Sequence, residues 1–394
     1  MSRPILPVLP GATIGVFGGG QLGAMFAQAA RRLGYQVAVW DPDPHAPALR
    51  LADLLFTAPF TDHTSLTEFA GCVSAVTYEW ENIPVSVAAE LERTVSLRPS
   101  SRILGLLQNR LEQKNFLAAQ GFPVAPYRTI AHPSELAARV AEVGFPAVCK
   151  IATAGYDGKG QWRLHGPADV PLVKEAFFRN STKDSQWIVE QYLPFEKEVS
   201  VLVIRGADGD VRIYPAVENR HEEGILRVTH APADIDHRIA EQVMVLAESV
   251  VRALGGIGVF CVEMFLLPDG RLFINEVAPR PHNSGHYTLD VCTVSQFEQQ
   301  VRALCGLPLG EVRLLCPAVM VNLIGEDFTR VTSNEGLISL LRRPGAKLHV
   351  YGKHTVRPGR KMGHVTFLAE KREEAWEAAV VFKKGLDSQR QQTH

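Results

Sequence analysis

The chain has 394 residues, a formal net charge of −1, 46% apolar residues and 21% charged residues. This length suffices for two or three domains with a large core, and the near-neutral charge excludes a bulk attraction to nucleic acid or to a membrane surface. No stretch approaches the ~18 uninterrupted apolar residues of a membrane span, and the proline-rich start does not predict a signal peptide. Six scattered cysteines without a Cys-x-x-Cys pair predict buried free thiols. We therefore expect a cytoplasmic protein.

The chain opens with a predicted βαβ unit. An apolar strand over residues 12–17 runs into Gly18-Gly-Gly-Gln-Leu-Gly23, a helix follows to Leu33, and a second strand over 36–40 ends at Asp41. Backbone amides of a glycine-rich turn at a helix N-terminus can hold an anion. The pattern partly fits a dinucleotide fingerprint with Asp41 as the ribose acid. The alternative is a glycine turn that holds no NAD.

The strand–helix alternation continues to about residue 100. A strand over 75–81 enters an acidic loop, a helix spans 84–93, and a short strand spans 94–97. Alternating strands and helices of this kind indicate a doubly wound parallel sheet. We therefore predict an N-terminal doubly wound, Rossmann-like domain over residues 1–105.

A second group of residues that could bind a ligand lies on a long helical stretch and on the segments after it. Residues 101–119 are predicted to be one helix, which carries Arg110 and Lys114, and Lys150 lies on a strand over 147–151. The next segment, Ala154-Gly-Tyr-Asp-Gly-Lys-Gly-Gln161, has three glycines and a lysine within six residues. Its amides and cation suit a polyphosphate, although an ordinary glycine hairpin remains the alternative.

The stretch from Phe260 to Glu276 predicts a β-hairpin. Asp269-Gly270 between apolar runs is a strong turn signal. A two-residue loop places Glu263 directly opposite Glu276, with Cβ atoms about 5 Å apart. Two carboxylates so close need a cation, and Mg²⁺ held by carboxylates and substrate phosphates is the natural answer. A solvent-facing pair of glutamates at a sheet edge is the alternative.

Two later segments are rich in polar groups. Ala278 to His286 is a loop dense in potential ligands, and residues 353–364 form a cationic turn around Pro358-Gly359. Basic side chains gathered at a turn suit a phosphate or a carboxylate. Taken alone, a solvated basic turn is the better explanation. Together, a lysine-bearing glycine loop, Lys150 and two opposed glutamates can hold ATP and Mg²⁺ for phosphoryl transfer.

These segments resemble the ATP-grasp superfamily and, within it, the family of N5-carboxyaminoimidazole ribonucleotide synthetases of purine biosynthesis. The most specific matches are Gly155-Tyr-Asp-Gly-Lys-Gly-Gln161 and Pro281-His-Asn-Ser-Gly-His286. Tyr156-Asp157 separates the chain from a formyltransferase branch that has a serine-rich loop. Further matching segments span nearly the whole chain: Gly18–Gly23, Val189–Gln191, Gly224–Leu226, Asn275–Arg280, Ser295–Glu298 and Arg357–His364.

The resemblance implies an ATP-dependent carbon–nitrogen ligase. ATP phosphorylates bicarbonate to carboxyphosphate, and the carboxyl group passes to the exocyclic amine of 5-aminoimidazole ribonucleotide. It also implies an ATP-grasp core of two α+β subdomains over residues 106–305, with a mobile lid at about 120–195, and a small C-terminal domain over 306–394. The expected partners are these small molecules and a second copy of the chain in a homodimer, with no nucleic acid and no membrane.

The resemblance also assigns residues to roles, with Mg²⁺ on Glu263 and Glu276. The residues around the acceptor and bicarbonate, which include the catalytic ones, are Tyr156, Asp157, Arg280, His282, Lys353 and Arg360. The residues around ATP are Arg110, Lys150, Gly155, Tyr156, Asp157, Gly158, Lys159, Gly160, Gln161, Glu190, Gln191, Tyr192, Leu193, Glu198, His221, Asn275 and Glu276. Gln21, Glu79 and Asn82 are expected near the ribonucleotide phosphate, because the first glycine loop binds no NAD in this family.

One position departs from the wider superfamily. Many ATP-grasp enzymes carry an asparagine two residues after the second metal glutamate, and here that residue is Ala278. A third protein ligand is therefore not expected there, and a regular strand would turn Asn275 to the other face. The remaining alternatives are an ATP-grasp formyltransferase or carboxylase for another amine, an NAD-dependent dehydrogenase, and a catalytically inactive ATP-binding regulatory subunit.

Overall fold

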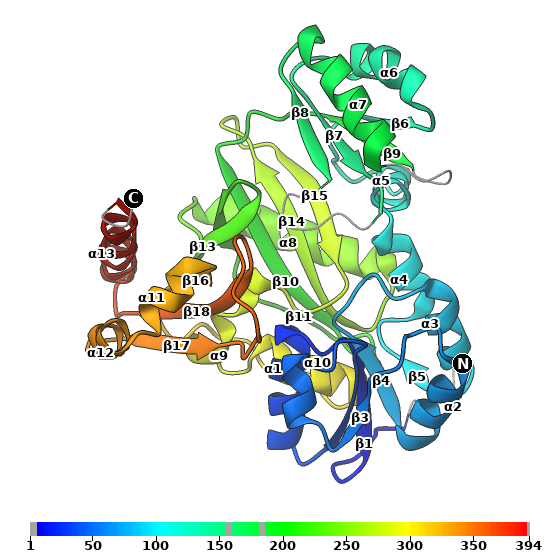
Figure 1. Ribbon diagram of the computed structural model, residues 1–394, viewed down its shortest axis with the longest axis vertical. Helices are drawn as coiled ribbons and strands as arrows, with labels where there is room; N and C mark the ends of the chain where they lie inside the picture. Colours follow the sequence, from blue (N-terminus) through cyan, green and yellow to red (C-terminus); the bar gives the residue numbers. More distant parts are fainter. Residues whose placement is uncertain (1–5, 154–159, 181–185, 392–394) are drawn as a thin grey trace.

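The computed structural model describes residues 6–153, 160–180 and 186–391. In these residues the long strands form three sheets. Figure 1 shows a four-stranded sheet at the top, a nine-stranded sheet across the middle and a five-stranded sheet at the lower right. No helix of the described residues is long and apolar enough to cross a membrane.

The N-terminal sheet is entirely parallel, with the strand order β3-β2-β1-β4-β5. This order confirms the predicted doubly wound fold. Ile14 and Val16 on β1 and Val37 and Val39 on β2 are fully buried, as strands covered on both faces require. The elements are β1 (Thr13–Phe17), α1 (Gln21–Arg32), β2 (Gln36–Trp40), β3 (Leu54–Phe56), α2 (His63–Cys72), β4 (Ala75–Tyr78), α3 (Val85–Glu92) and β5 (Ser96–Leu97).

The single helix predicted over residues 101–119 is in fact two helices, α4 (Ser101–Gln108) and α5 (Arg110–Ala119). The break lies at Asn109, whose side chain accepts hydrogen bonds from the amides of Leu111 and Glu112. An asparagine that caps a helix N-terminus in this way starts a new helix rather than continuing the old one. As a result Arg110 is the first residue of α5.

The uppermost sheet is antiparallel, with the order β6-β9-β7-β8. Two helices pack against it and bury Trp187, whose ring stacks on Phe177 at a centroid distance of 4.3 Å. The elements are β6 (Tyr127–Ile130), α6 (Leu136–Val143), β7 (Ala147–Ile151), β8 (Gln161–Leu164), α7 (Val170–Asn180) and β9 (Trp187–Gln191). Lys150 and Glu190 belong to this sheet, in the region where the resemblance implies a lid.

The large sheet has the order β15-β14-β10-β12-β13-β16-β18-β17, and β11 pairs with β10. Its C-terminal strands β16 and β18 are hydrogen-bonded into the same ladder as the central strands. Residues 211–222 form two separate strands, β11 and β12. The strands are β10 (Lys197–Arg205), β11 (Val211–Ile213), β12 (Val217–Glu222), β13 (Ile225–Ala231), β14 (Gly258–Leu266), β15 (Leu272–Ala278), β16 (Ala318–Ile324), β17 (Ala346–Val350) and β18 (Lys361–Leu368).

Helices cover this sheet and share its hydrophobic core with the strands. Helix α8 packs Val243, Ala247 and Val250 against Phe260 and other residues of β14 and β10. The helices of this part are α8 (His237–Leu254), α9 (Thr288–Val291), α10 (Gln296–Cys305), α11 (Glu326–Val331), α12 (Asn334–Leu341) and α13 (Arg372–Gln391).

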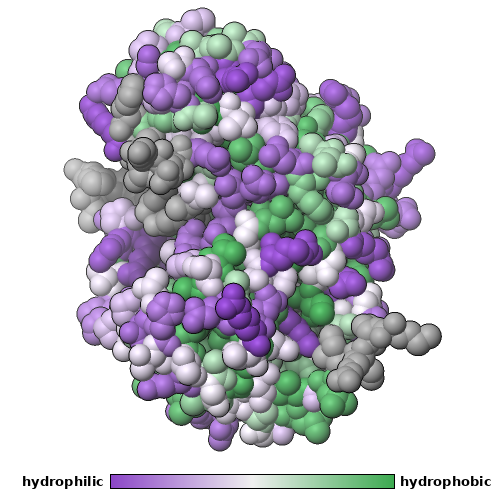
Figure 2. Space-filling model, turned by 90° about the vertical axis from the view of Figure 1, so that its right-hand side faces the viewer, coloured by the Kyte–Doolittle hydropathy of each residue, from purple (hydrophilic) through white to green (hydrophobic). Residues whose placement is uncertain are grey.

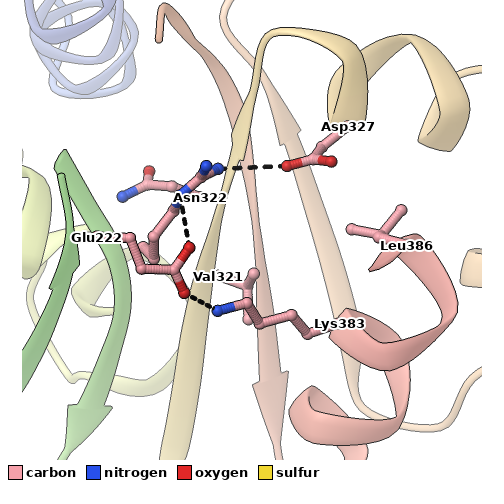
Figure 3. A pocket seen from close by; sticks show the side chains of 7 residues that line it. Glu222, Val321, Asn322, Asp327, Lys383 and Leu386 are labelled. Atoms are coloured by element: carbon pink, nitrogen blue, oxygen red, sulfur yellow. Dashed lines mark hydrogen bonds and ion pairs between the residues drawn. The ribbon is translucent and has the colours of Figure 1, made fainter. Parts of the chain in front are cut away.

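An ion-pair cluster ties the C-terminal helix α13 to the large sheet (Figure 3). Arg227 on β13 lies 3.2 Å from Glu222 and 3.3 Å from Asp327, and Glu222 also pairs with Lys383 on α13. Asp327 is 4% exposed, so its charge needs this partner. The cluster therefore serves to anchor α13 and α11.

All six cysteines are free thiols, as predicted, but only Cys149, Cys261 and Cys305 are buried, whereas Cys292 and Cys316 are half-buried and Cys72 is exposed. On the face shown in Figure 2, polar and apolar residues are interspersed, and apolar residues gather most in its lower part.

Candidate active site

The hairpin β14–β15 brings the two glutamates together. Glu263 is paired with Glu276 in the ladder, which confirms the predicted register. The predicted two-residue turn is wrong, however. The amide of Leu267 donates to the carbonyl of Arg271, so three residues form the loop, and Gly270 takes the left-handed conformation at φ 83°.

A β-bulge corrects the register that this longer loop would otherwise impose. Met264 pairs with Ile274, whereas the preceding residue Glu263 pairs with Glu276, so Asn275 is the extra residue. Without the bulge Glu263 would face Asn275. Strand β15 is therefore irregular at this point, and the argument that alternation turns Asn275 to the other face does not hold.

Each glutamate has a cationic partner. Nη1 of Arg110 lies 2.5 Å from Oε2 of Glu276, and Nε2 of His282 lies 2.8 Å from Oε1 of Glu263. Burial works against ionisation of Glu263, but His282 and other cations lower the pKa of this carboxyl to about 2. Both carboxylates remain partly exposed. Two ionised carboxylates that face each other are hard oxygen ligands, so the donor set fits Mg²⁺.

Ala278 lies beside this pair, opposite Cys261, as the departure from the superfamily pattern predicts. Sγ of Cys261 and the ligand atoms of Glu263 and His282 lie within 4.8 Å of one another. A thiol is a soft ligand and suits Mg²⁺ poorly.

Two lysines share one buried carboxylate on the inner strands of the upper sheet, where α5 approaches it. Oε2 of Glu190 lies 3.1 Å from Nζ of Lys150 and 3.3 Å from Nζ of Lys114. Burial alone would raise the pKa of Glu190, but Lys114, Lys150 and Arg110 together lower it to about 2. Burial in turn lowers the pKa of Lys114, against the effect of Glu190. The group has more positive than negative charge and so favours a polyphosphate.

The predicted nucleotide residues lie on β9, on β10 and on neighbouring segments. The amides of Gln191 and Tyr192 donate to the carbonyls of Pro126 and Pro146. Leu193 is buried against Ala125 and Leu267.

Farther along, Nδ1 of His221 lies 2.6 Å from Oε2 of Glu198, which joins β12 to β10. In the predicted phosphate loop, Gly160 and Gln161 are described, with Gln161 beginning β8. Gly155, Tyr156, Asp157, Gly158 and Lys159 lie outside the described residues.

The first glycine loop binds carboxylates of the protein itself. The amide of Gly19 donates to Oδ2 of Asp41 at 2.6 Å, and the amide of Gly20 donates to Oε1 of Glu79 at 2.5 Å. A Cβ atom on Gly20 would stand 2.5 Å from that same glutamate oxygen, so the approach requires glycine here. Because Asp41 already accepts from Gly19, the structure gives no support to its interpretation as a ribose acid for NAD.

Glu79 belongs to a group of charges that also includes Arg280 and Lys353. Burial raises the pKa of Glu79, while Arg280 and Lys353 act in the opposite direction. Arg280 pairs directly with Glu81. Nζ of Lys353 donates to the carbonyl of Lys361 at 2.8 Å. The N-terminal sheet, the loop after β15 and the cationic turn therefore meet at this point.

A buried hydrogen-bond chain holds the loop that carries His282. Nδ1 of His282 lies 2.8 Å from Oγ of Ser284, which lies 2.9 Å from Oγ of Ser200. The amide of Asn219 donates to Ser200 and its oxygen accepts from Thr229. Strands β10, β12 and β13 thus fix the position of this imidazole.

Three further predicted residues lie near these groups. Gln21 is the first residue of α1, and Asn82 is half-buried in the loop after β4. Nη1 of Arg360 donates to the carbonyl of Thr355 and so braces the cationic turn.

Three residues of the site were not predicted. Lys114 was noted only as a helical lysine, and Gln113 and Glu81 received no individual role. Gln113 is 3% exposed and its carboxamide bonds to the backbone of Val277 on β15. Polar residues at positions 110, 113 and 114 share one face of a helix, and this spacing is the signal that could have identified them.

Family models and known relatives match most of the chain. Residues 11–108 match the ribonucleotide synthetase preATP-grasp domain, residues 115–297 the ATP-grasp domain, and residues 318–378 the phosphoribosylaminoimidazole carboxylase C-terminal domain. The chain is 41% identical over 374 residues to N5-carboxyaminoimidazole ribonucleotide synthase of Bacillus subtilis, covering 95% of each chain. It is 42% identical over 357 residues to the enzyme of Brucella melitensis, covering 91% of this chain and 96% of that one.

Solved structures indicate the same family. A crystal structure of an N5-carboxyaminoimidazole ribonucleotide synthetase with ADP superposes with a TM-score of 0.91 at 42% identity, covering 96% of this chain and 98% of the other. The Aspergillus clavatus enzyme in complex with ADP and 5-aminoimidazole ribonucleotide gives a TM-score of 0.87 at 34% identity, covering 96% and 99%. The chain therefore belongs to the N5-carboxyaminoimidazole ribonucleotide synthase family.

Proposed function

We propose that this chain carboxylates 5-aminoimidazole ribonucleotide with bicarbonate and ATP, and releases N5-carboxyaminoimidazole ribonucleotide, ADP and phosphate. Family membership makes it an ATP-dependent ligase of purine biosynthesis. The observation that carries the detailed assignment is the convergence of Glu263, Glu276 and Arg110 with the two lysines on Glu190. This set of charges suits a metal-bound triphosphate.

The reaction has two steps. An oxygen of bicarbonate attacks the γ-phosphorus of ATP, the bond to ADP breaks, and carboxyphosphate forms. The exocyclic amine of the ribonucleotide then takes the carboxyl group, as such or as CO₂ released from carboxyphosphate, while phosphate leaves and the amine loses a proton. Both steps develop charge on phosphate oxygens, so fixed cations are the protein's main contribution.

Residues of the upper sheet and α5 hold the triphosphate in this proposal. Lys150 and Arg110 neutralise phosphate oxygens, and the 155–161 loop covers them. Phosphate oxygens can replace Glu190 as the partner of Lys150, since Lys114 continues to neutralise that carboxylate. Glu198 accepts from the ribose hydroxyls, His221 lines the pocket, and the segment from Glu190 to Leu193 faces adenine.

Glu263 and Glu276 would hold Mg²⁺, with Asn275 nearby. The ion would supply positive charge that offsets the negative charge on the phosphate groups in the transition state. In this proposal, Arg110 and His282, which neutralise the two glutamates in this structure, exchange these partners for phosphate or carboxyphosphate oxygens.

The acceptor lies where Glu79, Arg280 and Lys353 meet. Lys353 and Arg360 contribute cations for the ribonucleotide phosphate, with Gln21 and Asn82 at the same end. Arg280 and His282 hold bicarbonate between this group and the metal carboxylates, and Tyr156 and Asp157 complete the pocket from the loop. Asp41 and Glu79 occupy two amides of the glycine loop, so phosphate binding there depends on Gln21 and the first turn of α1.

The chain is also proposed to act in the cytoplasm as a homodimer. Support for the homodimer comes from the family resemblance. Sedimentation equilibrium at micromolar concentration tests it, and a monomeric mass would refute it.

A coupled assay tests the function. ADP release should require both bicarbonate and 5-aminoimidazole ribonucleotide, with one ADP formed for each ribonucleotide consumed. ADP release that needs neither would refute the assignment, and turnover with another amine would favour a related carboxylase or a formyltransferase. Binding of ATP without turnover would indicate a regulatory subunit, and binding of NAD without ATP a dehydrogenase.

A further inference from the structure

Strand β15, which carries Glu276, lies at the edge of the large sheet. On its inner side it pairs with β14, and on its outer side the backbone groups of an edge strand need other partners. Two outward-facing residues can be identified. The amide of Ile274 donates to the carbonyl of Pro123, and the carbonyl of Ile274 accepts from Nζ of Lys114 at 3.3 Å.

The second outward-facing residue is Val277, and its partner is a side chain. Oε1 of Gln113 accepts from the amide of Val277 at 2.9 Å, and Nε2 of Gln113 donates to its carbonyl at 3.1 Å. Nε2 also donates to the carbonyl of Leu107 at 3.2 Å. The carboxamide therefore pairs with Val277 as one residue of a neighbouring strand would.

The spacing of these two residues identifies the bulge. In a regular strand the outward-facing backbone groups recur at every second residue, so Ile274 would be followed by Glu276. Here the interval is three residues, because Asn275 is the extra residue of the bulge. Lys114 and Gln113, adjacent on α5, therefore match the bulged strand and not the regular one.

Without the bulge, β15 would place different side chains opposite β14. The three-residue loop at Pro268–Gly270 would pair Glu263 with Asn275 and Glu276 with Val262, so a slip of one residue would move Glu276 toward the core face. Val262 is fully buried, so that position does not suit a carboxylate.

We propose that Gln113, with Lys114, is the positioning residue that fixes the bulge at Asn275 and thereby holds Glu276 opposite Glu263. Gln113 acts through the strand and touches neither metal nor substrate. The inference rests on the proposed role of Glu276 as a metal ligand, and it adds a residue for which no role was assigned. It also explains why Gln113 is buried on α5, the helix whose Arg110 pairs with the same glutamate, Glu276.

The test compares Gln113→Met, which keeps the volume but loses all three side-chain hydrogen bonds, with Gln120→Leu at the exposed end of the same helix. The probe is Mn²⁺, titrated into enzyme saturated with ADP and followed by electron paramagnetic resonance, so that no turnover is needed. Loss of the groups that orient metal ligands weakens metal binding about 10- to 100-fold. We expect a loss in this range for Gln113→Met and none for Gln120→Leu.

A second readout separates positioning from general stability. Gln113→Met should raise the Mg²⁺ concentration for half-maximal turnover, with the KM for the ribonucleotide changed less than twofold. A variant that melts earlier but binds Mn²⁺ as tightly as the parent would overturn the proposal. Gln113→Glu keeps the acceptor for the amide of Val277 and should give an intermediate affinity. If Gln113→Met does not fold, the affinity of Gln113→Glu for Mn²⁺ decides the test.

Glu276→Gln is measured in parallel. If it weakens Mn²⁺ binding while Gln113→Met and Gln113→Glu do not, the positioning proposal fails and the metal site stands. If Glu276→Gln itself binds Mn²⁺ normally, the proposed metal site fails and the role of Gln113 falls with it.

Discussion

Replacing Glu190 by glutamine tests the charge group that it forms with Lys114 and Lys150. Glu190→Gln keeps the shape but leaves the ammonium groups of Lys114 and Lys150 facing a neutral amide. Each lies 3.1–3.3 Å from the carboxylate oxygen, and at an effective dielectric constant of about 20 such a contact is worth about 5 kcal/mol before desolvation. Removing one partner of a buried ion pair costs about 3–5 kcal/mol net. We expect the free energy of unfolding of Glu190→Gln to fall by an amount in this range.

Urea unfolding followed by circular dichroism and tryptophan fluorescence measures the loss. Glu196→Gln, on the exposed connection after β9, is the matched control and should change stability by less than about 0.5 kcal/mol. ATP should restore part of the stability of Glu190→Gln, because its phosphates supply the missing negative charge.

A double-mutant cycle with Lys114→Met decides whether the charges are coupled. Removing one lysine should cost less in the Glu190→Gln background than in the parent, with a coupling energy of about 1–3 kcal/mol. Additive losses, or a Glu190→Gln loss below about 1 kcal/mol, would refute the interpretation of this group as a coupled charge network.

Four shorter predictions follow. Glu276→Gln should lose at least 100-fold in ATP turnover while its circular dichroism stays unchanged, and near-normal turnover at ordinary Mg²⁺ would contradict the metal assignment. Lys353→Ala should raise the KM for the ribonucleotide about tenfold more than the KM for ATP, and equal effects would remove Lys353 from the acceptor site. Gln21→Ala should raise the KM for the ribonucleotide, and an unchanged value would remove Gln21 from the phosphate end. Because the folded pKa of Glu190 is lowered to about 2, its stabilisation is complete above the unfolded value near 4.5 and is lost as the pH falls toward 2. Urea titrations should show about 2 kcal/mol less from this group at pH 3 than at pH 6, and Glu190→Gln should lack this difference.

The hairpin shows how far the sequence alone can predict the site. The apolar alternation and Asp269-Gly270 located both strands and the turn, and the pairing of Glu263 with Glu276 is confirmed. The two-residue loop was nevertheless wrong, and an extra residue at Asn275 compensates for it. The residue just past the bulge, Val277, is hydrogen-bonded by Gln113 of α5, about 160 residues earlier in the chain, and a local pattern around residue 275 does not reveal this partner.

Partners that come from distant segments set the same limit elsewhere. The glycine loop was predicted from its spacing, but its amides at Gly19 and Gly20 bind Asp41 and Glu79. Glu190 was predicted only as one of the residues around ATP, whereas its carboxylate pairs with two lysines. Residue types locate a charged site, but only the packing of sheets and helices shows which charges neutralise one another.

The ladder of the large sheet runs without interruption from the glutamate hairpin to the strands that flank the cationic turn. Hydrogen-bonded strands therefore span the distance between the carboxylates of Glu263 and Glu276 and the cationic turn that carries Lys353, and such strands resist stretching. Lys150 belongs to a separate sheet, joined to the rest through short connections (Figure 1). In the proposed mechanism, the acceptor and the metal would keep a constant separation, and the distance from Lys150 to the phosphates would be the one that changes during the catalytic cycle.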